Sequence, residues 1–350
     1  MKVLTVVGAR PQFVKAAAVS GHLRKRAQEI LVHTGQHYDV TMSDLFFREL
    51  GIPAPDVHLN VGSGSHADQT ARMLIGIEEA IDRERPDRVL VYGDTNSTLA
   101  GALAAAKLNA PLVHVEAGVR SFNRAMPEEI NRVVTDRLAS LLCCPGDAAA
   151  GNLRDEGITE GVHVTGDVMR DIFERTLPRL SESRLASFGV SPRTYLLLTI
   201  HRAQNTDEPG RLQRLMSAVA AATAEPVVFP VHPRTRQTLK AAGVANCGTI
   251  RLVDPVGYLD MLTLQRHARL VLTDSGGVQK EAYWLGVPCV TLRSETEWTE
   301  TVDAGWNQVV GDDPDAIRRA VGDGKPPSRH PDLYGDGRSA ERIVDLMTCA

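Results

Sequence analysis

The stretch LVLTDSGGVQKE, residues 270–281, contains the strand, turn and helix start that decide the fold. Leu270–Thr273 predicts a buried strand, and the residues after the two glycines predict the first turns of a helix. The N–H groups that open a helix have no partner within it, and the helix dipole there favours anions. Glu281 lies just beyond, where its carboxylate could accept hydrogen bonds from two ribose hydroxyls. The stretch therefore predicts a nucleotide phosphate site, although a simple tight turn also uses a short glycine motif.

The same alternation of short apolar runs and longer helical runs covers the rest of the chain. In the first part, strands are predicted at Val3–Val7, Glu29–Val32, Arg88–Tyr92, Leu112–Val115, Leu141–Cys143 and Val162–Val164. Helices are predicted between them at Pro11–Lys25, Ala67–Arg85, Ser97–Leu108 and Glu128–Ala139. After a charged, proline-containing stretch near residues 170–192, strands resume at Tyr195–Thr199, Val227–Val231, Ile250–Leu252, Leu270–Thr273 and Cys289–Leu292.

Uniformly apolar strands that alternate with helices are typical of parallel sheets covered on both faces. The pattern therefore predicts an α/β chain with two doubly wound, Rossmann-like domains that face each other over a cleft. The predicted domains are residues 1–168 and residues 190–330. The length of 350 residues agrees with this division, because it exceeds what one ordinary core holds.

Composition argues against several classes of function. The net charge of -4 gives no basic footprint for nucleic acid. No apolar run is long enough for a membrane span, and Val3–Val7 is too short for a signal peptide. The five cysteines, which include Cys143 and Cys144, show no spacing typical of a zinc site. We therefore expect reduced thiols, a cytoplasmic location and no metal.

Carboxylates follow predicted strands in the first domain, where ligands bind in open α/β sheets. Asp94 and Glu116 end two consecutive strands, and neighbouring strands about 4.8 Å apart would bring both into one crevice. Glu128 follows at the next helix start. Like charges that share a site raise the pKa of one carboxyl, which places an acid beside a base for proton transfer. The alternatives are a helix cap for Asp94 and a favourable helix-dipole charge for Glu128.

Cations and histidines occupy other strand ends. Arg10 and Lys15 lie at the first strand–helix junction, where they could contact phosphate or form a surface ion pair. His201 directly follows a buried strand and could donate to a departing phosphate, or it could be a histidine with structural partners only. His33 and His37 have metal-like spacing but straddle a glycine turn, so we expect a loop or ligand contact instead of a metal site.

The turn after the first strand bears on cofactor use. Epimerases that oxidise a sugar hydroxyl carry a nicotinamide, which usually requires G-x-G-x-x-G at this turn. Here the turn reads GARPQF, residues 8–13, and contains one glycine. We therefore expect no tightly held dinucleotide and no other cofactor.

Eight segments together resemble the non-hydrolysing UDP-N-acetylglucosamine 2-epimerase family. They span nearly the whole chain in order: GARPQ (8–12), HTGQHYD (33–39), YGDTNSTLAGALAA (92–105), HVEAGVRSF (114–122), MPEEINR (126–132), HRAQN (201–205), HPRTR (232–236) and TDSGGVQKEA (273–282). The resemblance implies the glycosyltransferase-B arrangement, a C-terminal helix in residues 331–350 that packs back on the first domain, and a homodimer. TGQHYD and TEW (296–298) resemble a subgroup with archaeal-type members and epimerases of UDP-2,3-diacetamido-glucuronic acid.

The resemblance also implies a mechanism without a nicotinamide. UDP is eliminated across C1–C2 of the sugar to give a 2-acetamidoglucal, and it re-adds while a proton reaches the opposite face of C2. By position, the implied acid–base groups are Asp94, Glu116 and Glu128, and His201 is the group that assists UDP departure. The implied UDP or substrate contacts are Arg10, Lys15, Ser275, Gly276, Gly277 and Glu281.

Two departures from the family pattern lie near the implied nucleotide site. RAQN, residues 202–205, replaces the Arg-Arg-Glu-Asn of many members, and Trp298 stands where many have an arginine. Arg202 and Arg293 are the candidates to replace that contact.

The leading hypothesis is reversible epimerisation of UDP-N-acetylglucosamine to UDP-N-acetylmannosamine. One alternative is the same chemistry on UDP-2,3-diacetamido-2,3-dideoxyglucuronate, and another is a hydrolysing relative that releases UDP and free N-acetylmannosamine. Outside the epimerases, the alternatives are a UDP-sugar glycosyltransferase and a nucleotide-sugar-binding regulator.

Overall fold

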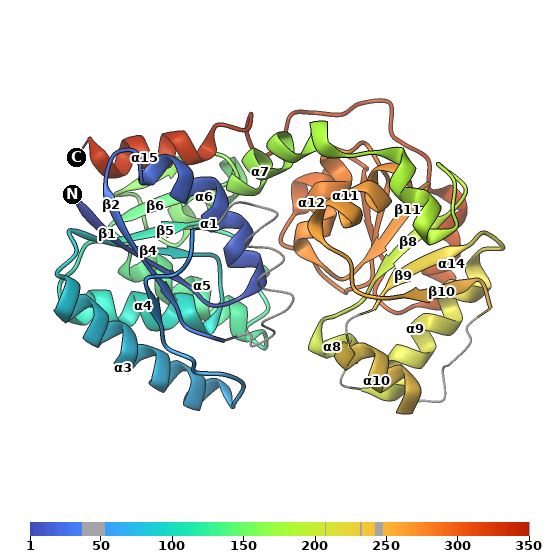
Figure 1. Cartoon of the computed structure of the whole chain (residues 1–350). Coiled ribbons are helices and arrows are strands. Elements are labelled where there is room, and N and C mark those ends of the chain that lie inside the picture. The colour runs from blue at the N-terminus through green and yellow to red at the C-terminus, as the bar shows by residue number, and fades with distance from the viewer. Residues whose placement is uncertain (37–52, 207, 232, 242–247, 350) are drawn as a thin grey trace. The chain divides into compact units, whose positions relative to one another are not determined.

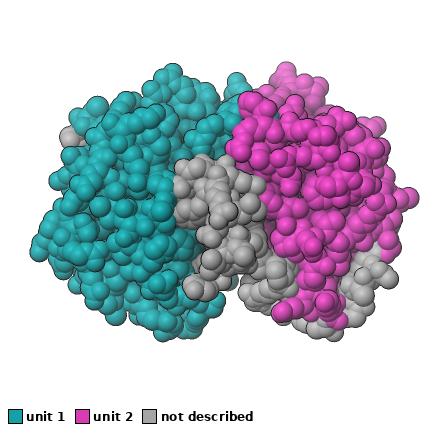
Figure 2. All heavy atoms as spheres, viewed as in Figure 1, with its two compact units in different colours: residues 1–177, 332–350 teal, residues 178–331 magenta. Residues whose placement is uncertain are grey.

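The chain divides into two compact units, residues 1–177 with 332–350 and residues 178–331 (Figure 1, Figure 2). The computed structural model describes residues 1–36, 53–206, 208–231, 233–241 and 248–349. Each unit is built on its own parallel sheet.

In its described residues, the first unit contains a seven-stranded sheet with the order β3-β2-β1-β4-β5-β6-β7. The strands are β1 (Lys2–Val7), β2 (Gln28–His33), β3 (Val57–His58), β4 (Arg88–Tyr92), β5 (Leu112–Val115), β6 (Leu141–Cys144) and β7 (Val162–Val164). The helices are α1 (Arg10–Leu23), α3 (His66–Glu84), α4 (Asn96–Lys107), α5 (Pro127–Leu138), α6 (Asp147–Asp155), α7 (Val168–Thr176) and α15 (Ser339–Thr348). The central strands lie between helices and are buried on both faces, which is why their sequences are continuously apolar.

The second unit repeats this plan. Its described sheet has six parallel strands in the order β10-β9-β8-β11-β12-β13. They are β8 (Leu196–Thr199), β9 (Val227–Pro230), β10 (Ile250–Val253), β11 (Leu270–Thr273), β12 (Cys289–Thr291) and β13 (Asn307–Val309). The α-helices are α8 (Ala203–Thr206), α9 (Pro209–Ala222), α10 (Pro233–Ala241), α11 (Tyr258–His267), α12 (Gly276–Trp284), α13 (Thr299–Asp303) and α14 (Pro314–Asp323). Two 3₁₀-helices, η1 (Leu177–Arg179) and η2 (Glu182–Phe188), lead from α7 toward β8.

The C-terminal helix α15 packs against α1 and α7 in the first unit (Figure 1). Its first N–H groups, from Ser339 and Ala340, donate to the Asp171 carboxylate on α7 at 3.0 and 2.7 Å. Just before it, the Tyr334 carbonyl accepts the Asp167 N–H at 2.9 Å. Arg338, the residue before α15, makes no capping hydrogen bond, and Asp171 caps the helix instead. The C-terminal segment is therefore bound to the first unit through its backbone groups.

The predicted strands are all present, with ends that differ by at most one residue. The prediction missed β3 and β13 because Val57–His58 is two residues long and Asn307–Val309 is mostly polar. It also missed α6, and it assigned part of α7 to a connection because charged residues separate the buried ones. None of the helices in the described ranges combines the length and the apolar character that a membrane crossing requires.

Candidate active site

In the second unit, the turn from β11 to α12 brings backbone N–H groups to the carboxyl end of the sheet. Ser275 is the residue before α12, and its side chain makes no capping hydrogen bond, so the first N–H groups of the helix are not capped by it. Ser275, Gly276 and Gly277 are all partly exposed. These features give α12 the open N-terminus that an anion site requires.

Asp274 holds this turn to the neighbouring strand end. Its carboxylate is fully buried and accepts the backbone N–H groups of His201 at 3.1 Å and Arg202 at 3.0 Å. The Asn205 amide donates to it as well, at 3.1 Å. Because β8 and β11 are paired, one carboxylate fixes the ends of both strands. Sequence reasoning did not single out Asp274, although an aspartate directly after a buried strand is the available signal.

His201 lies beside this anchor with its side chain 54% exposed. Its Nε2 is 4.0 Å from Asp274 Oδ1, which is too far for a hydrogen bond. The exposure leaves the imidazole accessible to a ligand, while its backbone is fixed by Asp274.

Glu281, on α12, lies one helical turn beyond the glycines and is buried. Its Oε2 accepts a hydrogen bond from Gln265 Nε2 on α11 at 2.7 Å. Gln265 is itself fully buried, so this amide fixes the orientation of the carboxylate. Gln265 was not predicted, because Met261, Leu262 and Leu264 near it are apolar and indicate a buried helix.

Arg202 and Arg293, the two arginines singled out from the sequence, share the carboxylate of Glu297. Arg293 is 1% exposed and binds Glu297 with both terminal nitrogens, at 2.9 and 3.0 Å. Arg202 approaches the same carboxylate at 3.8 Å. Arg293 is therefore held in a buried ion pair, and Glu297 is a functional candidate that the sequence analysis missed.

Trp298 packs directly on the start of α12. A Cβ atom added at Gly276 would lie 2.8 Å from the indole Nε1, so glycine leaves the space that the ring needs. Lys280 Nζ lies 3.6 Å from the centroid of the ring. Trp298 thus braces the first turn of α12 instead of offering the cation that an arginine would supply.

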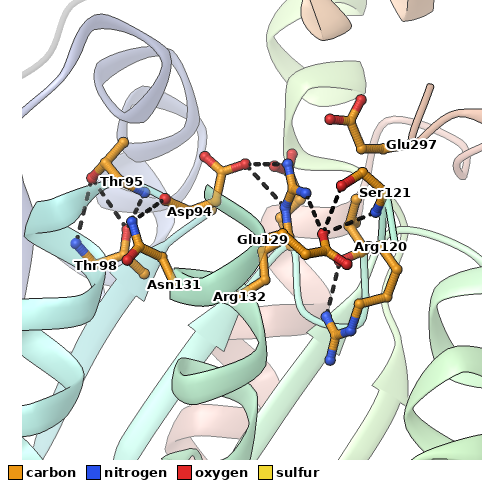
Figure 3. Close-up of polar contacts among 12 residues, drawn as sticks. Asp94, Thr95, Thr98, Arg120, Ser121, Glu129, Asn131, Arg132 and Glu297 are labelled. Carbon is orange, nitrogen blue, oxygen red and sulfur yellow. Dashed lines mark hydrogen bonds and ion pairs between the residues drawn. The ribbon is translucent and has the colours of Figure 1, made fainter. Parts of the chain in front are cut away.

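In the first unit, Asp94 and Glu116 follow β4 and β5, which pair in parallel with Tyr92 opposite Val115. The prediction that these strands are neighbours is confirmed. Arg132 on α5 donates to Asp94 Oδ2 through Nη2 and through Nε at 3.1 Å (Figure 3). The cap of α4 is Thr95, which accepts the Thr98 N–H, so the alternative that Asp94 caps this helix is wrong.

Glu116 is held by Lys15. Lys15 Nζ lies 2.6 Å from Glu116 Oε1, and both side chains are nearly buried. Glu116 has a left-handed backbone with φ of 73°, a conformation that non-glycine residues adopt at a cost of about 1–3 kcal/mol and that is concentrated at functional sites. Because both side chains are nearly buried, the alternative that Lys15 makes a surface ion pair is wrong. The pair lies against the turn of Gly93.

The remaining residues of the first unit separate into accessible and structural groups. Glu128 is partly exposed in the first turn of α5. Its neighbour Glu129 is buried and accepts hydrogen bonds from the Ser121 N–H and hydroxyl and from Arg132 (Figure 3). Arg132, which bridges Asp94 and Glu129, was not predicted. Glu128 is thus the acidic residue of this pair that remains available to a ligand.

The first strand–helix turn is fixed by Gln12. Its Oε1 accepts the Gly8 and Ala9 N–H groups at 2.8 and 3.1 Å, and its Nε2 donates to the Tyr92 carbonyl at 3.0 Å. This amide therefore ties the turn after β1 to the end of β4. The Arg10 side chain lies outside the described part of the structure.

Of the two histidines with metal-like spacing, His33 and His37, only His33 lies in the described part of the structure. His33 stacks between Phe13 and His58. Burial, and to a smaller extent the charge of His58, lowers the pKa of His33 to about 4. His37 lies outside the described residues. Within the described residues, no three His, Cys, Asp or Glu side chains are grouped as metal ligands would be.

Comparison with known proteins places this geometry in a family. A family model described as UDP-N-acetylglucosamine 2-epimerase matches residues 21–348. A Methanococcus maripaludis protein named UDP-N-acetylglucosamine 2-epimerase homolog is 49% identical over 99% of each chain. A Pseudomonas aeruginosa protein named UDP-2,3-diacetamido-2,3-dideoxy-D-glucuronate 2-epimerase is 46% identical over 99% of each chain.

Solved structures agree with the sequence matches. The crystal structure of Methanocaldococcus jannaschii UDP-GlcNAc 2-epimerase in complex with UDP-GlcNAc and UDP matches with a TM-score of 0.94 and 42% identity over all of both chains. The predicted fold class, two α/β domains with parallel sheets, is confirmed, and so is the predicted family at the level of UDP-N-acetylglucosamine 2-epimerases. The chain belongs to the UDP-N-acetylglucosamine 2-epimerase family.

Proposed function

We propose that this protein reversibly epimerises UDP-N-acetylglucosamine at C2 to give UDP-N-acetylmannosamine. The observation that carries the proposal is the pair of carboxylates at neighbouring strand ends. Asp94 and Glu116 leave β4 and β5 side by side, and each is oriented by a cation, Arg132 or Lys15. A binding protein would need the nucleotide site but would not need these positioned carboxylates.

The proposed reaction proceeds by elimination and re-addition. A carboxylate takes the C2 proton, the C2–H electron pair forms a C1=C2 double bond, and the C1–O bond breaks with its electrons leaving on UDP. The product is a 2-acetamidoglucal. A phosphate oxygen of UDP then attacks C1 while a carboxylic acid returns a proton to the opposite face of C2. Electrons balance without an external oxidant, and no water is added to the sugar.

The roles divide between the two units. In the first unit, Asp94, Glu116 and Glu128 are the proposed acid–base groups, and Arg10 and Lys15 are proposed UDP or substrate contacts. The Lys15 ammonium at 2.6 Å strengthens the ionised form of Glu116, as charge-assisted hydrogen bonds do.

In the second unit, the proposed phosphate site is Ser275, Gly276 and Gly277, because the open N-terminus of α12 favours negative charge. Glu281, oriented by Gln265, is proposed to accept the ribose hydroxyls. The proposed further contacts are His201, which would assist UDP departure and return, and the arginines Arg202 and Arg293.

The test is incubation with UDP-N-acetylglucosamine in heavy water. Deuterium at C2 together with UDP-N-acetylmannosamine supports the proposal, and their joint absence contradicts it. Asp94→Asn and Glu128→Gln should each slow exchange at least about a hundredfold, the usual loss for a general acid or base. Asp82→Asn on the exposed face of α3 is the matched control and should leave the exchange rate unchanged. Accumulation of UDP and free N-acetylmannosamine would identify a hydrolysing enzyme, and UDP release that depends on an acceptor sugar would identify a glycosyltransferase.

A second substrate has a specific observation in its favour. The Pseudomonas aeruginosa relative at 46% identity is named for UDP-2,3-diacetamido-2,3-dideoxy-D-glucuronate. The chemistry at C2 would be the same, with an added carboxylate on the sugar. Measuring kcat/KM for both UDP-sugars, with products identified by mass spectrometry, decides between them. We also propose a homodimer on the family resemblance, which sedimentation analysis tests.

A further inference from the structure

His114 lies at the centre of a buried ionic network under the carboxylates of the first unit. It is fully buried on β5, and its Nδ1 lies 2.6 Å from Asp136 Oδ1 on α5. The other oxygen of Asp136 contacts Arg120 Nη1 at 2.7 Å, and Arg120 binds Glu156 through two nitrogens at 2.7 and 2.9 Å. These four side chains form one chain of contacts, of which only Glu156 is substantially exposed.

The hydrogen-bond partners of His114 determine its protonation. Its Nε2 lies 2.8 Å from the Gly93 carbonyl oxygen, which can only accept a hydrogen bond, so Nε2 carries a hydrogen. Its Nδ1 faces Asp136, whose other oxygen already accepts from Arg120 and from the Gly118 N–H at 3.1 Å. Burial opposes ionisation of Asp136, but the charges and hydrogen bonds of His114 and Arg120 prevail and lower its pKa. Asp136 Oδ1 and the Gly93 carbonyl oxygen therefore hold the ring at both of its nitrogens.

The two groups held by this ion pair belong to the two turns that carry the carboxylates. Gly93 immediately precedes Asp94, and Gly118 is two residues after Glu116. Both glycines and Glu116 have left-handed backbones, with φ of 62°, 77° and 73°. A Cβ added at Gly118 would lie 2.2 Å from the Ala149 carbonyl oxygen, so this backbone packs directly against α6 and requires glycine. Strained turns persist only when their surroundings over-determine them, and the His114–Asp136 pair supplies that restraint.

We propose that His114 is a positioning residue that, with Asp136, holds the Gly93 and Gly118 turns so that Asp94 and Glu116 keep their reactive orientation. The inference rests on the proposed function for its catalytic consequence, whereas the protonation state is independent of it. His114 touches no reacting atom in this scheme. It acts through backbone groups, and both turns are tied to one ion pair.

The first experiment reads the protonation state directly. Protein labelled with ¹⁵N at histidine should show a directly bonded proton on Nε2 of His114, with the resonance assigned by its loss in His114→Gln. Asp136→Asn should keep this proton, because the Gly93 carbonyl still accepts it. Wild-type protein with no proton on Nε2 would overturn the inference, whatever the enzyme's activity.

The second experiment separates positioning from stability. His114→Gln replaces two ring nitrogens that reach opposite partners by one amide group, so kcat should fall about ten- to a hundredfold, as for loss of groups that orient active-site residues, while KM stays within about twofold. Asp136→Asn, which can keep every backbone contact, should lose less. Glu29→Gln is the matched control: Glu29 is equally buried and accepts from Thr5, Ser20 and Arg24, but it lies at the opposite end of the sheet, where β2 begins.

The outcomes distinguish this inference from the proposed function. Wild-type protein without C2 exchange contradicts the function and leaves the ring protonation to be judged by its spectrum. Active wild type with His114→Gln that keeps kcat within twofold contradicts the positioning role. A loss in Glu29→Gln as large as that in His114→Gln would also overturn it, because destabilisation alone would then account for the effect.

Discussion

Replacing Gly276 by alanine tests whether the start of α12 is the nucleotide phosphate site. The added Cβ would lie 2.8 Å from Trp298 Nε1, where ordinary contacts begin at 3.4 Å. The φ of Gly276 is not in the left-handed region, so alanine suits the backbone and the clash with the ring is the whole perturbation. Trp298 is 6% exposed and is covered by Lys280, so the ring cannot turn aside into solvent.

The contact must open by roughly 0.6 Å, and overpacking of this kind costs about 1–3 kcal/mol. Because Trp298 is confined, we expect the first turn of α12 to move, which displaces the N–H groups that would face a phosphate. A loss of that size corresponds to about a 5- to 150-fold increase in the Kd for UDP. Titration calorimetry with UDP measures this change directly and does not depend on turnover.

A double-mutant cycle isolates the contact. Trp298→Phe removes the indole nitrogen, so adding Gly276→Ala in that background should change the Kd by no more than about threefold. Gly322→Ala is the matched control, since it lies in α14 with no atom within 4 Å of the added Cβ, and it should leave UDP binding unchanged. Wild-type affinity in Gly276→Ala, or an equal loss with Phe at 298, would refute the reasoning.

Three further predictions follow from single groups. Asp94→Asn should reduce turnover at least about a hundredfold while calorimetry shows unchanged UDP affinity, because the proposed nucleotide contacts remain. Burial and the charge of His58 lower the pKa of His33 to about 4, so the unfolded chain binds the extra proton between about pH 6.5 and 4. The free energy of unfolding should therefore fall by about 2–3 kcal/mol as pH falls through that window. Denaturant titrations at several pH values should show a weaker dependence of this free energy on pH in His33→Gln. Burial raises the pKa of the Cys144 thiol to about 12, whereas Cys349 is exposed, so a thiol reagent followed by mass spectrometry should label Cys349 before Cys144 in the native protein.

The sheet of each unit could be predicted because its central strands are buried on both faces. Arg88–Tyr92 and Leu112–Val115 were predicted with their observed bounds, since their mainly apolar runs lie between Asp87 and Gly93 and between Pro111 and Glu116. Because helices alternate with the strands along the chain, neighbouring strands were predicted to be parallel. The two strands that were missed have too few apolar residues to produce such a signal, and their strand geometry comes from pairing with β2 and β12.

The candidate site was predicted at the level of strand ends but not of contacts. Asp94 and Glu116 follow strands that can be located in the sequence, so their proximity could be inferred. Their partners could not, because the guanidinium of Arg132 approaches Asp94 from 38 residues away and Lys15 approaches Glu116 from 101 residues away. Such pairings depend on how helices dock on the sheet, which short-range patterns do not encode.

Glu297 matters for interpreting Trp298, which stands where many family members have an arginine. An arginine there would join Arg202 and Arg293 around one carboxylate that already holds both. Breaking the buried Arg293–Glu297 pair by removing the carboxylate would cost about 3–5 kcal/mol, so Glu297 stabilises the buried arginine. Under the proposed function, a diphosphate that contacts these arginines would share them with Glu297. Trp298 adds no charge there and packs on the start of α12 at Gly276, which is why we expect the affinity for UDP to depend on the shape of this contact.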